Sequence, residues 1–270
     1  MITGNKFDCD NLPQGCKIGE AVSVEGTFNG RFNSITIQRI AKHNGSVDRQ
    51  DFISPCPKDV DAMLGELSGT ISSLGNAPLK RLLLDVFSDN EVREKLRSWP
   101  AAQVRHHAYI GGLLAHTLTV AKLGQRSAEF YDVDKELLVA GALLHDIGKI
   151  QEFDCGLTIV YTDKGNLLGH TILGSSLVRD KISAIPSFPE RLSWQLLHII
   201  GSHHGKREWG AIVEPMTLEA FLVFISDYAD SRAVRYQTLI QEQRPLEQNI
   251  SPWDSTLETR VYAPKFEEGQ

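Results

Sequence analysis

The stretch LLVAGALLHDIGK, residues 137–149, joins a continuous apolar run to a His-Asp pair at its end. The run is apolar nearly all round at helical spacing, which predicts a helix buried at the centre of the protein. Burying the imidazole of His145 and the carboxylate of Asp146 without partners costs several kcal/mol. A metal ion offsets that cost, because it binds a neutral imidazole and an ionised carboxylate. The stretch therefore predicts a helical fold with a metal centre in its core.

Two more polar residues stand inside apolar helical patterns. His116 lies on the preceding amphipathic segment, and Asp227 lies within the last strongly apolar one. Ligands from three different helices converge only in the core of a helical bundle, which is where bundles build metal sites. We therefore predict that His116, His145, Asp146 and Asp227 form a metal site.

Histidine is concentrated in one part of the chain. The chain has nine histidines, and all but one lie within residues 106–204. His170 and the pair His203-His204 supply enough further ligands for a second metal. A lone histidine on an apolar helix is most often an ordinary core residue, and His198 is interpreted in that way.

The first part of the chain has the pattern of a β-hairpin. Residues 21–25 and 34–38 alternate in hydrophobicity, and the turn dipeptide Asn29-Gly30 lies between them. A lone hairpin is marginal in water, so it must pack on another part of the protein. We predict a small β module over residues 1–57.

From Lys58 onward, apolar residues recur at helical spacing over most of the chain. Residues 156–166 do not fit and predict a short hairpin or loop between helices. The segment 58–270 is therefore predicted to be a mainly α, helical domain with an irregular C-terminal tail. Its predicted core includes Leu113, Leu114, Leu143, Leu144, Leu222 and Ile225.

Composition limits the class of protein. Hydrophobic residues make up 41% and charged residues 23%, as in an ordinary soluble globular protein. No apolar run is long enough to span a bilayer and no secretory signal is recognisable, so we expect a cytoplasmic protein with no membrane partner. The four cysteines form no CxxC pair, which argues against a zinc-thiolate site. The net charge of −6 argues against a broad basic surface, though not against a local basic groove.

The order of the polar residues resembles the HD phosphohydrolase superfamily. That superfamily has a histidine, a His-Asp pair and a distant aspartate, in the order of His116, His145-Asp146 and Asp227. The resemblance implies one metal ion on these residues, a second ion bridged by Asp146, and a metal-activated hydroxide that attacks phosphorus. The further ligands of the second ion would be His170, His203 and His204.

Several ordered motifs resemble the YhaM-type 3′→5′ exoribonucleases more closely. These motifs are Pro100-Ala101-Ala102, His106-His107-Ala108-Tyr109, Gly111-Gly112-Leu113-Leu114, and His203-His204-Gly205 with Glu208 and Gly210. The resemblance runs from about Leu64 to the C-terminal region and implies Mn²⁺ for activity and single-stranded RNA as substrate. That family begins with an OB barrel, and residues 1–57 resemble only its closing part, which implies a partial OB-fold. The family pattern has Glu at the position of Ala115.

Further polar residues are candidates for catalysis and substrate binding. Lys149 lies one helical turn beyond His145 and could hold a phosphoryl oxygen as a point charge. The predicted catalytic residues are Asp146, Lys149 and His107. The predicted substrate contacts are His106, Lys206 and Arg232. A strand-binding groove is predicted from Phe28, Arg31 and Phe32 near the hairpin turn, and from Lys149, Lys206, Arg207 and Arg232 in the helical part.

The residues leave three functional classes open. These are an exonuclease on RNA or single-stranded DNA ends, a hydrolase of small nucleotides or cyclic dinucleotides, and a non-catalytic nucleic-acid binder with a structural metal. Residues 205–210, GKREWG, lack the Gly-Tyr-Pro signature of cyclic-dinucleotide phosphodiesterases of the HD-GYP type, which disfavours that type. Imidazole and carboxylate ligands without thiolate suit one or two ions of Mn, Fe, Ni, Co or Zn. The expected partner is single-stranded RNA or a nucleotide, and a homo-oligomer is left open.

Overall fold

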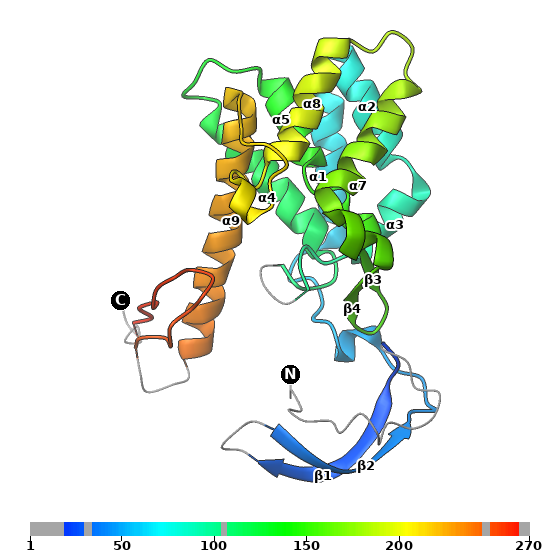
Figure 1. Ribbon diagram of the computed structural model, residues 1–270, viewed down its shortest axis with the longest axis vertical. Coiled ribbons are helices and arrows are strands. Elements are labelled where there is room, and N and C mark those ends of the chain that lie inside the picture. The colour runs from blue at the N-terminus through cyan, green and yellow to red at the C-terminus, as the bar shows by residue number, and fades with distance from the viewer. Residues whose placement is uncertain (1–18, 30–33, 104–106, 245–248, 265–270) are drawn as a thin grey trace. The chain divides into compact units, whose positions relative to one another are not determined.

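The computed structural model describes residues 19–29, 34–103, 107–244 and 249–264 of the 270-residue chain (Figure 1). The described chain divides into two compact units. One contains the described residues up to Ser54 together with Cys155–Val160, and the other contains the rest. Within the described residues, no helix is long and apolar enough to cross a membrane.

The smaller unit is built on a two-stranded antiparallel hairpin. Strand β1 (Val22–Asn29) pairs with β2 (Ser34–Lys42), with a shift of register between Glu25 and Gly26. The predicted hairpin is therefore confirmed. Among the described residues no third strand joins this sheet, so the OB-fold stays a prediction.

The predicted interruption near residue 156 is also a hairpin. It consists of β3 (Phe153–Cys155) and β4 (Ile159–Tyr161), which form a second two-stranded sheet between two helices. This confirms that the chain leaves the helical pattern there, but the predicted interruption ran to residue 166, whereas helix α7 (Asp163–Ser183) already begins at Asp163.

The larger unit is a helical bundle, as the pattern from Lys58 predicts. Its helices are α1 (Val60–Ser73), α2 (Ala77–Phe87), α3 (Asn90–Ser98), α4 (Gly112–Ser127), α5 (Lys135–Leu144), α6 (Lys149–Glu152), α7 (Asp163–Ser183), α8 (Glu190–Ser202) and α9 (Leu218–Gln243), with a 3-10 turn η3 (Arg207–Trp209). Several begin at a side chain that accepts hydrogen bonds from the free N–H groups of the first turn. These N-cap residues include Asp59, Asn76, Asp89, Asp134, Thr162 and Thr217.

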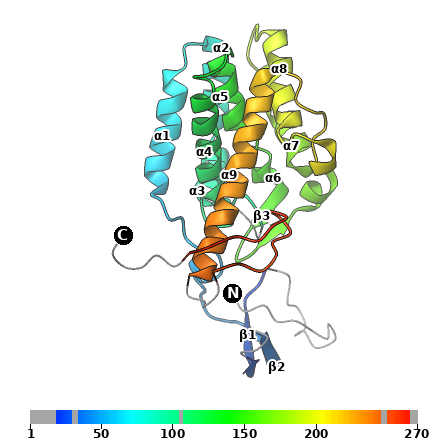
Figure 2. The ribbon, with the colours of Figure 1, turned by 90° about the vertical axis from the view of Figure 1, so that its left-hand side faces the viewer.

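Helix α5 lies at the centre of the bundle. It packs against α4, α8 and α9, and Figure 2 shows α4, α5 and α9 running beside one another. Every residue of α5 from Leu137 to Leu144 is buried. Gly141 lets α8 approach closely, because a Cβ atom there would lie 2.7 Å from the Ile199 side chain. The central helix thus ends with its last carbonyls deep in the protein, and the His-Asp pair follows at that point.

The predicted core is correct except at one position. Leu113, Leu114, Leu143, Leu144 and Leu222 are buried, but Ile225 is 40% exposed. The inward face of α9 at this level carries Leu222, Val223 and Ser226 instead. The segment is apolar on nearly every side, so its pattern could not indicate which face turns inward.

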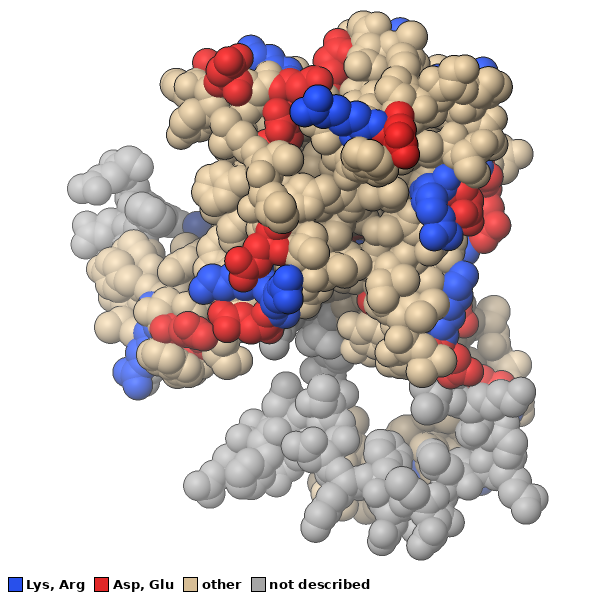
Figure 3. Space-filling view, turned by 45° about the horizontal axis from the view of Figure 1, so that its top comes forward, with Lys and Arg blue, Asp and Glu red and all other residues tan. Residues whose placement is uncertain are grey.

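Charged residues of both signs are interspersed on one face of the molecule (Figure 3). On the face shown in Figure 3, basic and acidic side chains lie next to one another and form no broad patch of one sign. Several of them are paired, such as Arg81 with Asp85 and Lys95 with Glu91.

Candidate metal centre

The bundle brings all seven predicted metal ligands to one place. His116 lies in the second turn of α4, and Asp227 lies in α9. The other ligands lie where helices end or bend. His145 and Asp146 follow the last residue of α5, His203 and His204 follow α8, and His170 follows a kink in α7 at Gly169 (φ 68°).

A first cluster joins α4, the end of α5 and α9. The Nε2 atom of His116 lies 3.2 Å from Asp227 Oδ1 and 3.3 Å from Asp146 Oδ2. The Nε2 atom of His145 lies 3.2 Å from His116 Nε2 and 3.4 Å from Asp146 Oδ2. Ligand atoms bound about 2.0–2.2 Å from one ion lie roughly 3 Å apart. These four side chains therefore have the spacing of a coordination shell.

A second cluster joins the α7 kink to the end of α8. His170, His203 and His204 offer nitrogen atoms that all lie within 4.8 Å of one another. The Nε2 atoms of His170 and His204 face each other at 3.1 Å. Asp146 Oδ1 lies 3.4 Å from His170 Nε2 and 3.5 Å from His203 Nε2.

Asp146 belongs to both clusters, because its two oxygens face different ways. Oδ2 faces the first cluster and Oδ1 faces the second. Asp146 Oδ1 and His203 Nε2 are buried and have no hydrogen-bond partner. Unpaired buried polar atoms are costly, and a cation between them would satisfy both. The residues present therefore fit divalent metal, which the Asp146 carboxylate would help to hold in either cluster.

The five histidines are held so that Nε2 points into the centre. Their Nδ1 atoms bond to Asp230 Oδ2 for His116 (2.7 Å), Ala142 O for His145 (2.7 Å), Glu152 Oε1 for His170 (3.0 Å), Ile200 O for His203 (2.7 Å) and Trp209 O for His204 (2.9 Å). An oxygen partner at Nδ1 favours the tautomer with its proton there and leaves the Nε2 lone pair for a metal.

The electrostatics of the carboxylates suit a cation. Burial opposes ionisation of Asp146, but attraction to Lys149 and His145 holds its pKa well below the usual value. Burial likewise opposes ionisation of Asp227 and Asp230, yet hydrogen bonds from nearby imidazoles lower both pKa values. All three side chains are therefore ionised, which is the form that binds metal.

The pKa values of the histidines shift in opposite directions in the two clusters. Burial lowers the pKa of His203, and it lowers the pKa of His204 to about 4, so both imidazoles are neutral near pH 7. For His116, burial also acts downward, but hydrogen bonds with Asp146, Asp227 and Asp230 raise its pKa well above the usual value. A position surrounded by three carboxylates attracts positive charge, whether a proton or a metal ion.

Two carboxylates that support ligands were not among the predicted site residues. Glu152 accepts hydrogen bonds from both the backbone N–H (2.9 Å) and the ring of His170 (3.0 Å). Asp230 Oδ2 bonds to His116 Nδ1 at 2.7 Å and to His107 Nε2 at 2.8 Å. Asp230 lies one turn beyond Asp227 on α9, so helical spacing was the available signal. No sequence signal pointed to Glu152, because its contact with His170 depends on how α7 folds back.

The other predicted residues take varied places. Lys149 is buried, and its Nζ donates to Asp146 Oδ2 at 2.6 Å. His107 is buried behind Asp230 with a positive φ of 51°, and its second ring nitrogen bonds to Tyr109. These contacts indicate that His107 positions Asp230.

His106 lies outside the described residues, as do Arg31 and Phe32 of the predicted groove. Lys206 and Arg232 lie near the mouth of the centre, each over an aromatic ring.

The segment that follows the His-Asp pair packs closely on α7, where Gly148 meets the backbone of His170 and Gly174. A Cβ atom on Gly148 would overlap the carbonyl oxygen of His170 and lie 2.5 Å from Gly174 N. We expect Gly148→Ala to lower the free energy of unfolding by about 1–3 kcal/mol through overpacking, and to reduce the metal content because His170 is displaced. Chemical denaturation and elemental analysis measure both.

Gly69→Ala is the matched control, because nothing lies within 4 Å of a Cβ at this helical position. That change should be neutral or add up to about 1 kcal/mol of stability. Equal stability and metal content in the two variants would contradict the role given to Gly148.

Comparison with known families agrees with this geometry. Residues 113–232 match the family model described as the HD domain. The matched span contains all seven clustered ligands of the centre. No solved structure matches the chain significantly. This match, together with the His/Asp clusters that could hold a divalent metal, supports a metal-dependent phosphohydrolase.

Proposed function

We propose that the chain is a dinuclear phosphodiester hydrolase that removes nucleotides from the 3′ end of single-stranded RNA, with Mn²⁺ as its metal. The observation that supports metal-dependent hydrolysis is the position of the Asp146 carboxylate. It faces both clusters, and one of its oxygens has no hydrogen-bond partner. The choice of RNA rests on the ordered motifs shared with the YhaM-type exoribonucleases.

His116, His145, Asp146 and Asp227 would hold one ion, and Asp146, His170, His203 and His204 would hold the other. Divalent ions at these positions supply Lewis acidity, which lowers the pKa of a water molecule and offsets charge on phosphoryl oxygens.

The chain's own residues prepare the centre for this chemistry. The Lys149 ammonium keeps Asp146 ionised and fixes its orientation through the 2.6 Å hydrogen bond. The Nδ1 bonds of the histidines prevent the rings from turning, so that no reorganisation is needed when substrate arrives.

The difference in burial among the predicted ligands supports one direction of approach for the substrate. His203, His204 and Asp227 line a surface cavity of about 220 Å³, whereas His116 and His145 are fully buried. A phosphodiester would therefore approach from the side of α9 and the end of α8. Arg232 lines the same cavity and supplies a positive charge for an anionic substrate.

The test is hydrolysis of a 5′-labelled single-stranded RNA with and without Mn²⁺. We expect a ladder that shortens from the 3′ end and requires the metal. The panel also includes duplex RNA, single-stranded DNA, mononucleotides and cyclic dinucleotides. Asp227→Asn, prepared identically, should be inactive and so exclude a contaminating ribonuclease.

Each outcome of this panel has a consequence. Release of nucleotides from the 5′ end would overturn the proposed polarity. Hydrolysis of mononucleotides or cyclic dinucleotides without any cleavage of oligomers would replace the exonuclease by a small-molecule hydrolase at the same centre. Metal-free protein with full activity would overturn the proposal entirely.

A further inference from the structure

The mouth of the metal centre is lined by aromatic side chains that the hydrolytic chemistry does not require. The predicted ligands His203, His204 and Asp227 line the cavity of about 220 Å³. Its remaining lining residues are Trp209, Phe224, Tyr228, Ser231, Arg232 and Thr256. We call Trp209, Phe224 and Tyr228 the aromatic wall.

The rings of the aromatic wall come from two elements and lie against one another. Trp209 belongs to η3, while Phe224 and Tyr228 are one turn apart on α9. The Trp209 and Tyr228 rings are nearly parallel, 12° apart, with centroids 5.6 Å from each other. The Phe224 ring lies 6.2 Å from Trp209 and 6.0 Å from Tyr228.

Two of the three rings of the aromatic wall are exposed to solvent, unlike those of an ordinary core cluster, while Phe224 is half-buried. Trp209 is 43% exposed and Tyr228 is 38% exposed. Leaving large apolar rings open beside a charged centre has a cost in water, and a ligand with a flat apolar face would recover it.

Two cations lie over the faces of these rings. Lys206 Nζ lies 4.8 Å from the centroid of Trp209, and Arg232 Cζ lies 4.7 Å from that of Tyr228. Lys206 is also paired with Glu208 at 3.5 Å. In the part of the chain that the structure describes, no carboxylate lies within 4.0 Å of the Arg232 guanidinium, so no described acidic side chain neutralises this charge.

We propose that the aromatic wall, with Arg232, binds the base of the nucleotide whose phosphate reaches the metal centre. This inference rests on the proposed function and adds where that nucleotide's base lies. Bases stack on aromatic rings. A guanidinium beside such a ring can stack on the base and attract the phosphate of the same nucleotide. The cavity is smaller than the roughly 300–1,000 Å³ of pockets that enclose whole ligands, so it fits a base better than a complete nucleotide.

The polar groups in the cavity predict little discrimination among bases. Apart from the ligand residues and Arg232, the polar groups on the side chains that line it are the hydroxyls of Tyr228, Ser231 and Thr256 and the indole N–H of Trp209. Reading a base edge requires a set of donors and acceptors at defined positions, as amide and carboxylate side chains provide. Stacking accepts any base, which suits an enzyme that removes nucleotides one after another.

A segment after α9 contributes Thr256 to the lining of this subsite. Asp254 accepts two hydrogen bonds from Arg235 on α9, at 2.9 and 2.6 Å. Its other oxygen accepts from the backbone N–H groups of Thr256 and Leu257. The turn that carries Thr256 is thus fastened to the same helix as Tyr228.

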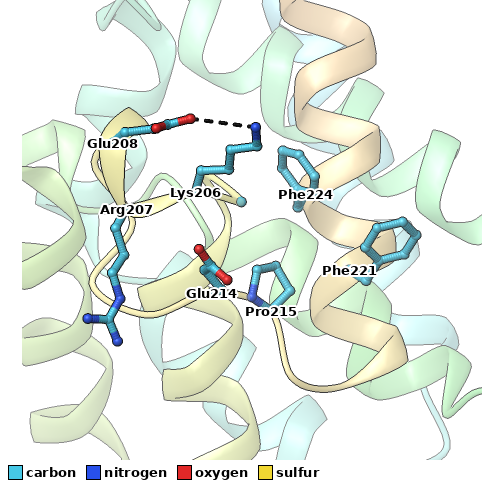
Figure 4. A pocket seen from close by; sticks show the side chains of 8 residues that line it. Lys206, Arg207, Glu208, Glu214, Pro215, Phe221 and Phe224 are labelled. Atoms are coloured by element: carbon cyan, nitrogen blue, oxygen red, sulfur yellow. Dashed lines mark ion pairs between the residues drawn. The ribbon is translucent and has the colours of Figure 1, made fainter.

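A larger neighbouring cavity of about 680 Å³ is a weaker candidate for the base (Figure 4). Figure 4 shows Phe221 and Phe224 on α9 at one side of it and Glu214 and Pro215 at its floor, with Arg207 directed away from the two rings. Its lining has two basic and two acidic side chains, Lys206, Arg207, Glu208 and Glu214. These charges cancel, and none of the predicted metal ligands lines the cavity.

The experiment compares two ligands that differ in the base. The first is 2-aminopurine riboside 5′-monophosphate, whose fluorescence is quenched on stacking, and the second is ribose 5-phosphate. Both are titrated against the metal-loaded protein, the second by displacement. We expect the base to improve the dissociation constant about tenfold. Tyr228→Ala should remove most of that gain and the quenching, while leaving the dissociation constant of ribose 5-phosphate within about twofold.

Two variants make the result specific. Tyr228→Phe keeps the ring and should restore both the affinity and the quenching. Tyr236→Ala is the matched control, since Tyr236 lies on α9 with a similar exposure of 41% but does not line the cavity. It should behave as the wild type. Thermal melting checks that all three variants are folded.

The inference is overturned if the base adds no affinity, or if Tyr228→Ala weakens both ligands equally. Cleavage of methyl p-nitrophenyl phosphate with Mn²⁺ is measured in parallel, because this diester has no base. If the base adds no affinity in the wild-type protein while diester cleavage is intact, the inference alone is rejected. Base-dependent binding without any diester or RNA cleavage would reject the proposed function and keep the aromatic wall as a nucleotide site.

Discussion

Asp146→Asn is expected to abolish activity and to remove most of the bound metal. The carboxylate faces both clusters, so its loss removes a ligand from each ion at once. We expect turnover of any phosphodiester substrate to fall by at least about 10³-fold, as when a residue on which a whole catalytic group depends is removed. Elemental analysis of the purified protein should show well under one ion per chain. Thermal stability should fall too, because metal binding stabilises the folded form.

A second change separates loss of metal from loss of folding. Asp146→Asn leaves the buried ammonium of Lys149 without its partner, and a buried uncompensated charge costs about 3–5 kcal/mol. Combining it with Lys149→Met removes that charge while keeping the length of the side chain. The double variant should regain stability but remain metal-free and inactive. Recovery of metal or activity in the double variant would contradict the bridging role of Asp146.

The central helix and its His-Asp pair could be predicted from the sequence because they conflict with ordinary folding energetics. Leu137–Leu144 is apolar on every side, and such a segment is stable only at the centre of a bundle. A histidine and an aspartate at its end then require a partner, and a metal ion is the simplest one. The same reasoning applies to His116 and Asp227, which the structure brings within 3.2 Å of each other.

The rest of the centre depends on contacts that no local pattern encodes. Glu152 meets His170 only because α7 bends at Gly169 and returns over α6. His107 turns toward Asp230 through a left-handed backbone conformation that the sequence did not indicate. For Ile225, hydrophobicity on every side of α9 left the inward face undecided, and the prediction of burial was wrong.

The aromatic wall was missed for a related reason. Trp209 and Tyr228 are separated by nineteen positions in the chain, in a 3-10 turn and a helix, and each taken alone is an ordinary aromatic residue. Only the tertiary fold makes their rings parallel at the mouth of the centre. The groove predicted from Phe28, Arg31 and Phe32 remains a prediction, because two of its three residues lie outside the described part of the chain.

Asp230→Asn is the second change for which we expect a large effect. Asp230 touches no predicted ion position directly, but its Oδ2 holds both His116 Nδ1 and His107 Nε2. The neutral amide keeps the shape and removes the charge that makes His116 a stronger ligand. Changes at such supporting carboxylates typically cost about 10–100-fold in metal affinity or activity. Competition with a chelating dye measures the affinity of the folded protein, and we expect a loss in that range.

Comparison with two further variants identifies the physical cause. Asp230→Ala should lose more than Asp230→Asn, because it leaves two buried imidazoles without an acceptor, and each unsatisfied group costs about 1–3 kcal/mol. His107→Phe removes one of the two bonds to Asp230 and leaves the other, so its effect on metal affinity should be smaller than that of Asp230→Asn. If all three variants lowered stability equally but left metal affinity unchanged, Asp230 would serve packing alone. If affinity instead follows the order wild type, His107→Phe, Asp230→Asn, Asp230→Ala, the carboxylate acts on the metal through His116, since only the bond to His116 reaches a ligand.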